Sequence, residues 1–131
     1  MAYLIDTDIY IYLMEGNQGI ADRIRDTGEE NIFLSSISVA ELYYGAFKSS
    51  KQDKNLFRIQ KNLEKLQILN FNHHAAKIFG RLKANLLRLG HPIADMDLEI
   101  ASIAIYHQHT LVTHNTKHFS PITELLLEDW T

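Results

Sequence analysis

Short apolar runs alternate along this chain with longer segments of helical periodicity. Three compact apolar runs are typical of buried strands, namely Tyr3–Ile5, Asn31–Leu34 and Thr110–Thr113, and shorter strands are expected at Gln67–Phe71 and Leu125–Leu127. Segments with apolar residues every three or four positions predict helices at Ile9–Leu13, Ile20–Arg25, Ser38–Phe47, Lys51–Leu66, His73–Leu89 and Asp95–His107. This alternation favours a parallel sheet covered by helices on both faces. We therefore expect one α/β domain over residues 1–131.

Composition fits a globular protein. Hydrophobic residues make up 46% of the chain and charged residues 22%, and there is no cysteine to form a disulfide or a thiolate zinc site. The start at Met1 is followed at once by Asp6 and Asp8, and no apolar run approaches the ~20 residues of a membrane-spanning helix. A cytoplasmic protein without membrane contact is expected.

The formal net charge of −3 argues against nucleic-acid binding by charge alone. Proteins that neutralise phosphates normally carry a basic surplus. If RNA is the substrate, basic residues must gather on one face, or bound cations must offset the acidic residues.

Polar clusters follow the predicted strands. They are Asp6–Asp8, Ser35–Glu41 and Thr113–Asn115, and a fourth, Asp95–Asp97, opens a helix. Ligands of open α/β sheets bind beyond the carboxyl ends of the strands, so we expect these clusters to converge. Converging carboxylates repel one another unless a cation neutralises them, and oxygen ligands favour Mg²⁺ or Mn²⁺ over zinc. Such a site suits the hydrolysis of phosphodiesters.

Five segments of the chain resemble the successive motifs of VapC-type PIN-domain toxins. They are YLIDTDIYIYL, ISVAELYYGAF, PIADMDLEIASIAI, LVTHNTKHF and LEDW, in the order and with the spacing of that family. The resemblance implies a three-layer PIN-like fold with a parallel sheet of four or five strands. It also implies an endoribonuclease that depends on Mg²⁺ or Mn²⁺, a cognate VapB-type antitoxin, and a homodimer.

The resemblance also assigns site residues. Asp6, Glu41 and Asp97 match the family's acidic positions and are the expected metal ligands, whereas Asn115 stands where many relatives have Asp. Asn115 brings no charge, so three carboxylates remain, which suit one ion better than two. The expected catalytic set also includes two residues that orient water and carboxylates, Thr7 and Thr113.

Several of these residues also have a purely structural interpretation. Asp6 could be an N-cap, Asp8 could favour the first turn of a helix through the helix dipole, and Asp95 could cap the helix that carries Asp97. Glu41 could form a capping box with Ser38, a role that excludes metal binding by the same carboxylate. For Asp6, Glu41 and Asp97 we favour the metal-binding interpretation, and for Asp8 and Asp95 the structural one.

The helix that begins near Ser38 is apolar on nearly every side, so it is either buried throughout or receives a partner on one side. The resemblance implies that this helix and the next line a groove for the antitoxin, which makes Tyr44, Phe47 and Phe57 the candidate antitoxin contacts. Six basic residues either form a rim that binds RNA phosphates or simply lie on solvated helix faces. They are Arg23, Arg25, Lys48, Lys51, Lys54 and Arg58. His114 and His118 lie near the expected site but are interpreted as surface residues.

Other functions fit less well or remain open. A phospho-receiver domain would need an Asp after its central strand and a Lys after a late one, and the strand ends here give Ser35, Asn70 and His114 instead. A catalytically inactive PIN-fold interaction module stays possible because of Asn115. A PIN nuclease that processes RNA outside a toxin–antitoxin pair is the remaining alternative.

Overall fold

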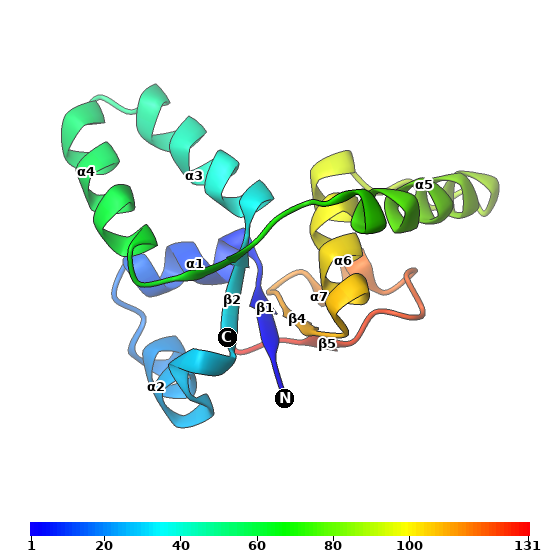
Figure 1. Ribbon diagram of the computed structural model, residues 1–131, viewed down its shortest axis with the longest axis horizontal. Helices are drawn as coiled ribbons and strands as arrows, with labels where there is room; N and C mark the ends of the chain where they lie inside the picture. The colour runs from blue at the N-terminus through cyan, green and yellow to red at the C-terminus, as the bar shows by residue number, and fades with distance from the viewer.

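The computed structural model describes residues 1–131 and has a parallel sheet at its centre (Figure 1). The sheet contains five strands in the order β3-β2-β1-β4-β5, which confirms the predicted parallel sheet. The strands are β1 (Tyr3–Ile5), β2 (Ile32–Ser35), β3 (Gln67–Leu69), β4 (Thr110–Val112) and β5 (Leu127–Glu128). The chain moves outward from β1 through β2 and β3, then returns to the other side of β1 as β4. The strand order therefore reverses between β1 and β4, the place where open α/β sheets bind ligands.

Helices cover both faces of the sheet, as the alternating pattern predicted. They are α1 (Thr7–Met14), α2 (Gln18–Thr27), α3 (Ser36–Lys48), α4 (Gln52–Leu63), α5 (His73–Arg88), α6 (Asp95–His107) and the one-turn α7 (Thr116–Phe119), with a 3₁₀ turn η1 at Glu29–Asn31. Figure 1 shows α1 to α4 on one side of the strands and α5 to α7 on the other. The molecule thus has three layers.

Each face of the sheet has its own apolar core. Leu4 and Leu111 pair across β1 and β4 and pack with the helices α5, α6 and α7. The next pair along the same strands, Ile5 and Val112, packs with α1 to α4 on the opposite face. Successive side chains of a strand point to opposite faces, so these short apolar runs are buried on both sides.

Several element boundaries differ from those predicted. Helix α3 begins at Ser36 and its N-cap is Ser35, whose hydroxyl accepts the backbone N–H of Ser38 at 3.0 Å. The predicted capping box of Ser38 and Glu41 is therefore wrong. The N-cap of α6 is Ala94, which caps through no side chain, so the N-cap role suggested for Asp95 is also wrong. Strand β5 begins two residues and ends one residue later than expected, where it pairs with β4.

No helix of this protein combines the length and the apolar character that crossing a bilayer requires.

Candidate active site

Asp6 lies at the carboxyl end of β1, at the point where the strand order reverses. Its backbone N–H donates to the carbonyl of Val112 at 2.8 Å, which ties the end of β1 to β4. Asp6 is 6% exposed, and each oxygen of its carboxylate accepts one hydrogen bond. Oδ1 accepts the backbone N–H of Thr7 at 2.8 Å, and Oδ2 accepts the buried hydroxyl of Thr113 at 2.7 Å. Asp6 is thus the N-cap of α1 and also part of a site between two strands.

Hydroxyl groups link Asp6's neighbour Thr7 to helix α3. The hydroxyl of Thr7 donates to Oε1 of Glu41 at 2.7 Å and lies 2.7 Å from the hydroxyl of Ser38. Because Thr7 has one hydroxyl proton, which goes to Glu41, Ser38 must donate to Thr7. Ser35 in turn donates to Ser38 at 3.3 Å. These hydrogen bonds run from Ser35 through Ser38 and Thr7 to the carboxylate of Glu41. Because Glu41 accepts from Thr7 of α1, it does not cap its own helix.

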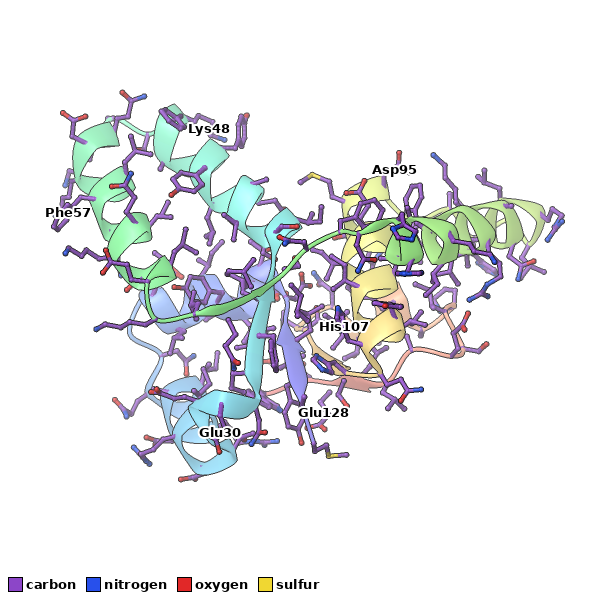
Figure 2. The ribbon with its side chains drawn as sticks, in the orientation of Figure 1. Glu30, Lys48, Phe57, Asp95, His107 and Glu128 are labelled. Atoms are coloured by element: carbon purple, nitrogen blue, oxygen red, sulfur yellow. The ribbon has the colours of Figure 1, made fainter.

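Asp97 approaches the same region from the first turn of α6. It lies on a different side of the helix from Asp95, whose carboxylate pairs with Lys83 of α5 at 2.9 Å, and Figure 2 shows Asp95 at the start of α6. The Oδ2 atom of Asp97 lies 3.0 Å from Nε2 of His118 in α7. His118, interpreted from the sequence as a surface residue, is therefore in contact with an expected metal ligand.

The loop after β4 completes the arrangement. Asn115 contributes its backbone N–H, which donates to the Thr113 hydroxyl at 3.1 Å, and its side chain makes no hydrogen bond. The neighbouring His114 donates its backbone N–H to Oδ2 of Asp8 at 3.2 Å, while Oδ1 of Asp8 accepts from Ile9. Both Asp8 oxygens are thus occupied by backbone donors, in line with the structural role expected for this residue.

Burial dominates the electrostatics of Asp6. Loss of hydration raises its pKa from 3.8 to about 6, and repulsion from Asp8 and Asp97 acts in the same direction against the lowering effect of the Thr113 and Thr7 hydrogen bonds. Burial also raises the pKa of Asp8. Neither Asp6 nor Glu41 forms a salt bridge with a basic side chain. Asp6 and Glu41 are therefore acidic groups that no basic side chain neutralises.

This donor set fits a hard divalent ion. No group of three Asp, Glu or His side chains is arranged in this structure so that it could hold an ion by itself. Glu41 accepts the Thr7 hydroxyl, whereas Asp97 lies near enough to Asp6 to raise its pKa. Mg²⁺ in phosphate-processing sites is commonly bound by one or two carboxylates, with water and phosphate as the other ligands. Asp6 and Asp97 match that pattern.

The raised pKa of Asp6 makes the stability of the metal-free protein depend on pH. The folded state disfavours the ionised carboxylate, so the free energy of unfolding should increase as the pH falls toward the pKa of about 6 and below it. Relative to Asp6→Asn, the unmodified protein should gain on the order of 1 kcal/mol between about pH 7.5 and about pH 5.

Urea unfolding of both proteins in a chelator-containing buffer measures this difference. The lowered pKa of His109 and the raised pKa of Asp8 also affect the pH dependence, but they are common to both proteins and cancel in the comparison. Parallel pH profiles for the two proteins would contradict a raised pKa at Asp6.

The fold and this site define a doubly wound α/β domain with an acidic centre at its switch point. The family model described as PIN domain matches residues 3–124. Ribonuclease VapC2 of Rickettsia felis is 36% identical over 99% of this chain and 98% of its own length. The tRNA(fMet)-specific endonuclease VapC of Shigella flexneri is 29% identical over 100% of this chain and 99% of its own length. The solved structure of DNA-bound VapBC from Salmonella typhimurium superposes with a TM-score of 0.93 at 30% identity, covering 100% of this chain and 99% of the other. The chain belongs to the PIN domain family and, within it, to the VapC ribonucleases.

Sequence reasoning missed Ser38 and His118 as parts of this site. Ser38 was interpreted as a helix cap, and its complete burial became apparent only in the structure. His118 was interpreted as a surface residue near the site, and its contact with Asp97 became apparent only in the structure. Neither residue has a local pattern that distinguishes it from a cap or a solvated side chain.

Proposed function

We propose that this protein is an endoribonuclease that depends on Mg²⁺ or Mn²⁺ and acts in the cytoplasm as the toxin of a VapBC-type toxin–antitoxin pair. The observation that carries the proposal is Asp6, a carboxylate 6% exposed at the switch point of the sheet, with no basic partner. A buried carboxylate next to other acids is destabilising unless it neutralises a cation. The nuclease names of full-length relatives support the reaction class.

Each residue of the site has a role in this proposal. Asp6 and Asp97 would hold the ion, which when bound would activate water and neutralise charge on the phosphoryl oxygens of RNA. Glu41, held by Thr7, binds and orients water on the α3 side of the site. Thr113 fixes Oδ2 of Asp6, so that this carboxylate keeps its orientation when the substrate enters.

Asn115 supports the site through its backbone N–H, a contact that does not depend on the side chain. The Asn115 side chain stays available to water or to the RNA backbone, but it adds no charge. The site thus binds a single ion in this proposal, because the fourth carboxylate that a second ion would need is absent.

The expected antitoxin surface has an exposed apolar character. Tyr44, Phe47 and Phe57 are 66%, 59% and 61% exposed, which fulfils the expectation that they are open to a partner. Figure 2 places Phe57 on the outer side of α4, away from the sheet. Tyr44 and Phe57 have a lysine over their rings, Lys48 and Lys61, respectively.

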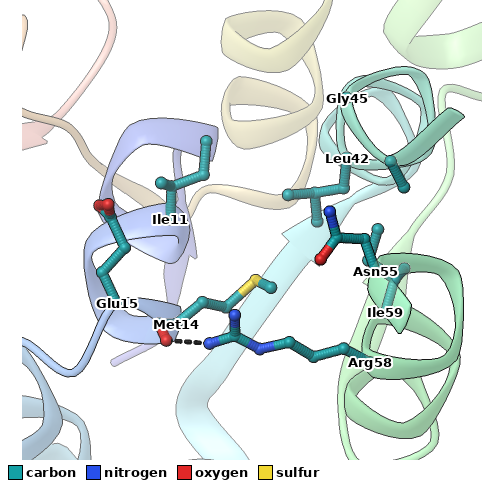
Figure 3. Close-up of a pocket in the computed structure, with 9 residues that line it drawn as sticks. Ile11, Met14, Glu15, Leu42, Gly45, Asn55, Arg58 and Ile59 are labelled. Carbon is teal, nitrogen blue, oxygen red and sulfur yellow. Dashed lines mark hydrogen bonds between the residues drawn. The ribbon is translucent and has the colours of Figure 1, made fainter. Parts of the chain in front are cut away.

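A groove of about 300 Å³ lies between α1, α3 and α4, and none of these three aromatic residues lines it (Figure 3). Its walls include Ile11 and Met14 from α1, Leu42 and Gly45 from α3, and Ile59 from α4. We assign the antitoxin's apolar segment to this groove, with the exposed aromatic residues as its outer contacts. The groove is lined by apolar residues and by three polar ones, Glu15, Asn55 and Arg58, a combination that suits an amphipathic helix.

The three arginines of the possible basic rim are engaged within the protein. Arg58 donates across the groove to the carbonyl of Met14, and Arg23 pairs with Glu128 while it covers the ring of Trp130. Arg25 pairs with Asp22. These arginines are therefore less available to RNA phosphates, and RNA binding in this proposal relies mainly on the ion and the site.

Metal removal tests the proposed function. Protein treated with EDTA and then dialysed should not cleave RNA, and addition of Mg²⁺ or Mn²⁺ should restore cleavage, because the chain itself offers no cation to the phosphate at this site. The readout is the rate of cleavage of a labelled RNA. Asp6→Asn protein purified in parallel controls for contaminating nuclease.

Cleavage that persists in EDTA would contradict the metal-dependent mechanism. Absence of cleavage with both ions would instead favour the catalytically inactive module. Asn115→Asp would then show, by restored activity, whether the missing acid is the cause.

A further inference from the structure

His118 is held in place by the core on the α5–α6 side of the sheet. It lies in the one-turn helix α7, directly before Phe119, which is 1% exposed and packs with the core cluster of α5 and α6. The backbone N–H of His118 also donates to the carbonyl of Asn115 at 3.0 Å. The position of the ring relative to α6 is therefore set by packing, although the ring itself lies at the surface.

The contact between His118 and Asp97 has a defined direction. Nε2 of His118 lies 3.0 Å from Oδ2 of Asp97, and an ionised carboxylate can only accept, so Nε2 is the donor. Asp97 has no other side-chain hydrogen bond in the structure. Asp6 differs in this respect, because donors from Thr7 and Thr113 hold both of its oxygens.

Asp97 needs such a restraint more than Asp6 does. Its side chain is one-third exposed and therefore free to turn toward water. Repulsion between Asp97 and Asp6, which contributes to the altered ionisation of Asp6, favours that outward rotation. The His118 hydrogen bond opposes it and occupies only Oδ2, which leaves Oδ1 without a protein donor.

We propose that His118 is a positioning residue that holds the Asp97 carboxylate toward Asp6, so that the two aspartates can share one divalent ion. The inference rests on the proposed function, because it assumes that this site binds a metal. It assigns to His118 an indirect role, through Asp97, and no contact with the ion. Residues that orient a ligating carboxylate typically change metal affinity by about 10–100-fold when they are removed.

Two substitutions at His118 separate positioning from other roles. His118→Leu removes the donor and keeps an apolar side chain, whereas His118→Gln places an amide N–H near the position of Nε2. Mn²⁺ affinity, measured by electron paramagnetic resonance of the free ion, should fall by about 10–100-fold in His118→Leu. His118→Gln should recover most of the loss. The metal concentration needed for half-maximal RNA cleavage should shift in parallel.

His91→Leu is the matched control, because His91 is an exposed histidine in the loop between α5 and α6 whose side chain makes no hydrogen bond. Its Mn²⁺ affinity should equal that of the unmodified protein. Thermal unfolding without metal verifies that the His118 variants are folded.

Unchanged Mn²⁺ affinity in His118→Leu would overturn the inference while leaving the proposed function intact. An equal loss in His118→Gln and His118→Leu would also overturn it, since the imidazole would then act as a ligand or through packing. An unmodified protein that neither binds Mn²⁺ nor cleaves RNA would overturn the proposed function itself, and with it this inference.

Discussion

Replacing Asp6 by asparagine is expected to abolish RNA cleavage while making the metal-free protein more stable. Cleavage should fall by roughly a thousandfold or more, since a catalytic ion contributes several kcal/mol of transition-state stabilisation and each 1.36 kcal/mol is a factor of ten. Cells that express the variant should also escape growth arrest. The measurements are cleavage of a labelled RNA and thermal unfolding in EDTA at neutral pH.

The gain in stability follows from the cost of ionising Asp6 in a buried position. A pKa raised from 3.8 to about 6 corresponds to about 3 kcal/mol at neutral pH, an upper bound for the gain. Asparagine remains a good N-cap for α1 through its oxygen, and its amide N–H can donate to the Thr113 hydroxyl oxygen in place of the bond that the Asp6 carboxylate accepts. The melting temperature should rise by several degrees.

Two further variants serve as comparisons for Asp6→Asn. Asp97→Asn should lose cleavage similarly but change stability less, because Asp97 is much more exposed than Asp6. Asp26→Asn, an exposed acid in α2, should change neither property. Undiminished cleavage by both Asp6→Asn and Asp97→Asn would refute the assigned site, and a lower melting temperature for Asp6→Asn would refute the cost assigned to its burial.

Filling the groove between α1, α3 and α4 is expected to release the nuclease from its antitoxin. Gly45 lines this groove, and a Cβ atom at this position would meet no atom within 4 Å. A side chain can therefore begin at position 45 without a clash at its Cβ atom, and we expect a Trp ring to extend into the groove. Gly45→Trp should weaken antitoxin binding by about 30-fold or more, since loss of a central apolar anchor at an interface commonly costs about 2 kcal/mol or more.

Gly45→Ala is the matched control for this substitution. Both variants replace a glycine within α3 and so gain helix propensity, alanine about 1 kcal/mol and tryptophan less, but alanine leaves the groove open. The probe is a VapB-type antitoxin, and its affinity is measured by calorimetry. RNA cleavage should stay unchanged in both variants. Equal antitoxin affinity for Gly45→Trp and Gly45→Ala would place the partner elsewhere.

The sequence alone determined the architecture and the acidic edge of the sheet. The apolar runs at β1, β2 and β4 indicate strands that are buried on both faces of the sheet, because such strands are apolar at successive positions. Parallel strands present their carboxyl ends at one edge, so the position of Asp6 directly after β1 was enough to place it there. The motif order supplied the same acids independently.

Tertiary structure alone decided which of these side chains meet. Ser35 and Ser38 are both suitable N-caps by local chemistry, and the choice depends on Thr7, which uses the Ser38 hydroxyl across 31 positions of the chain. His118 reaches Asp97 over 21 positions, through the way α7 packs beside α6. The groove likewise draws its walls from three helices, and the aromatic residues singled out in the sequence lie outside it. Hydrophobic periodicity states which side of an element is buried, but the neighbour that covers that side is set by long-range packing.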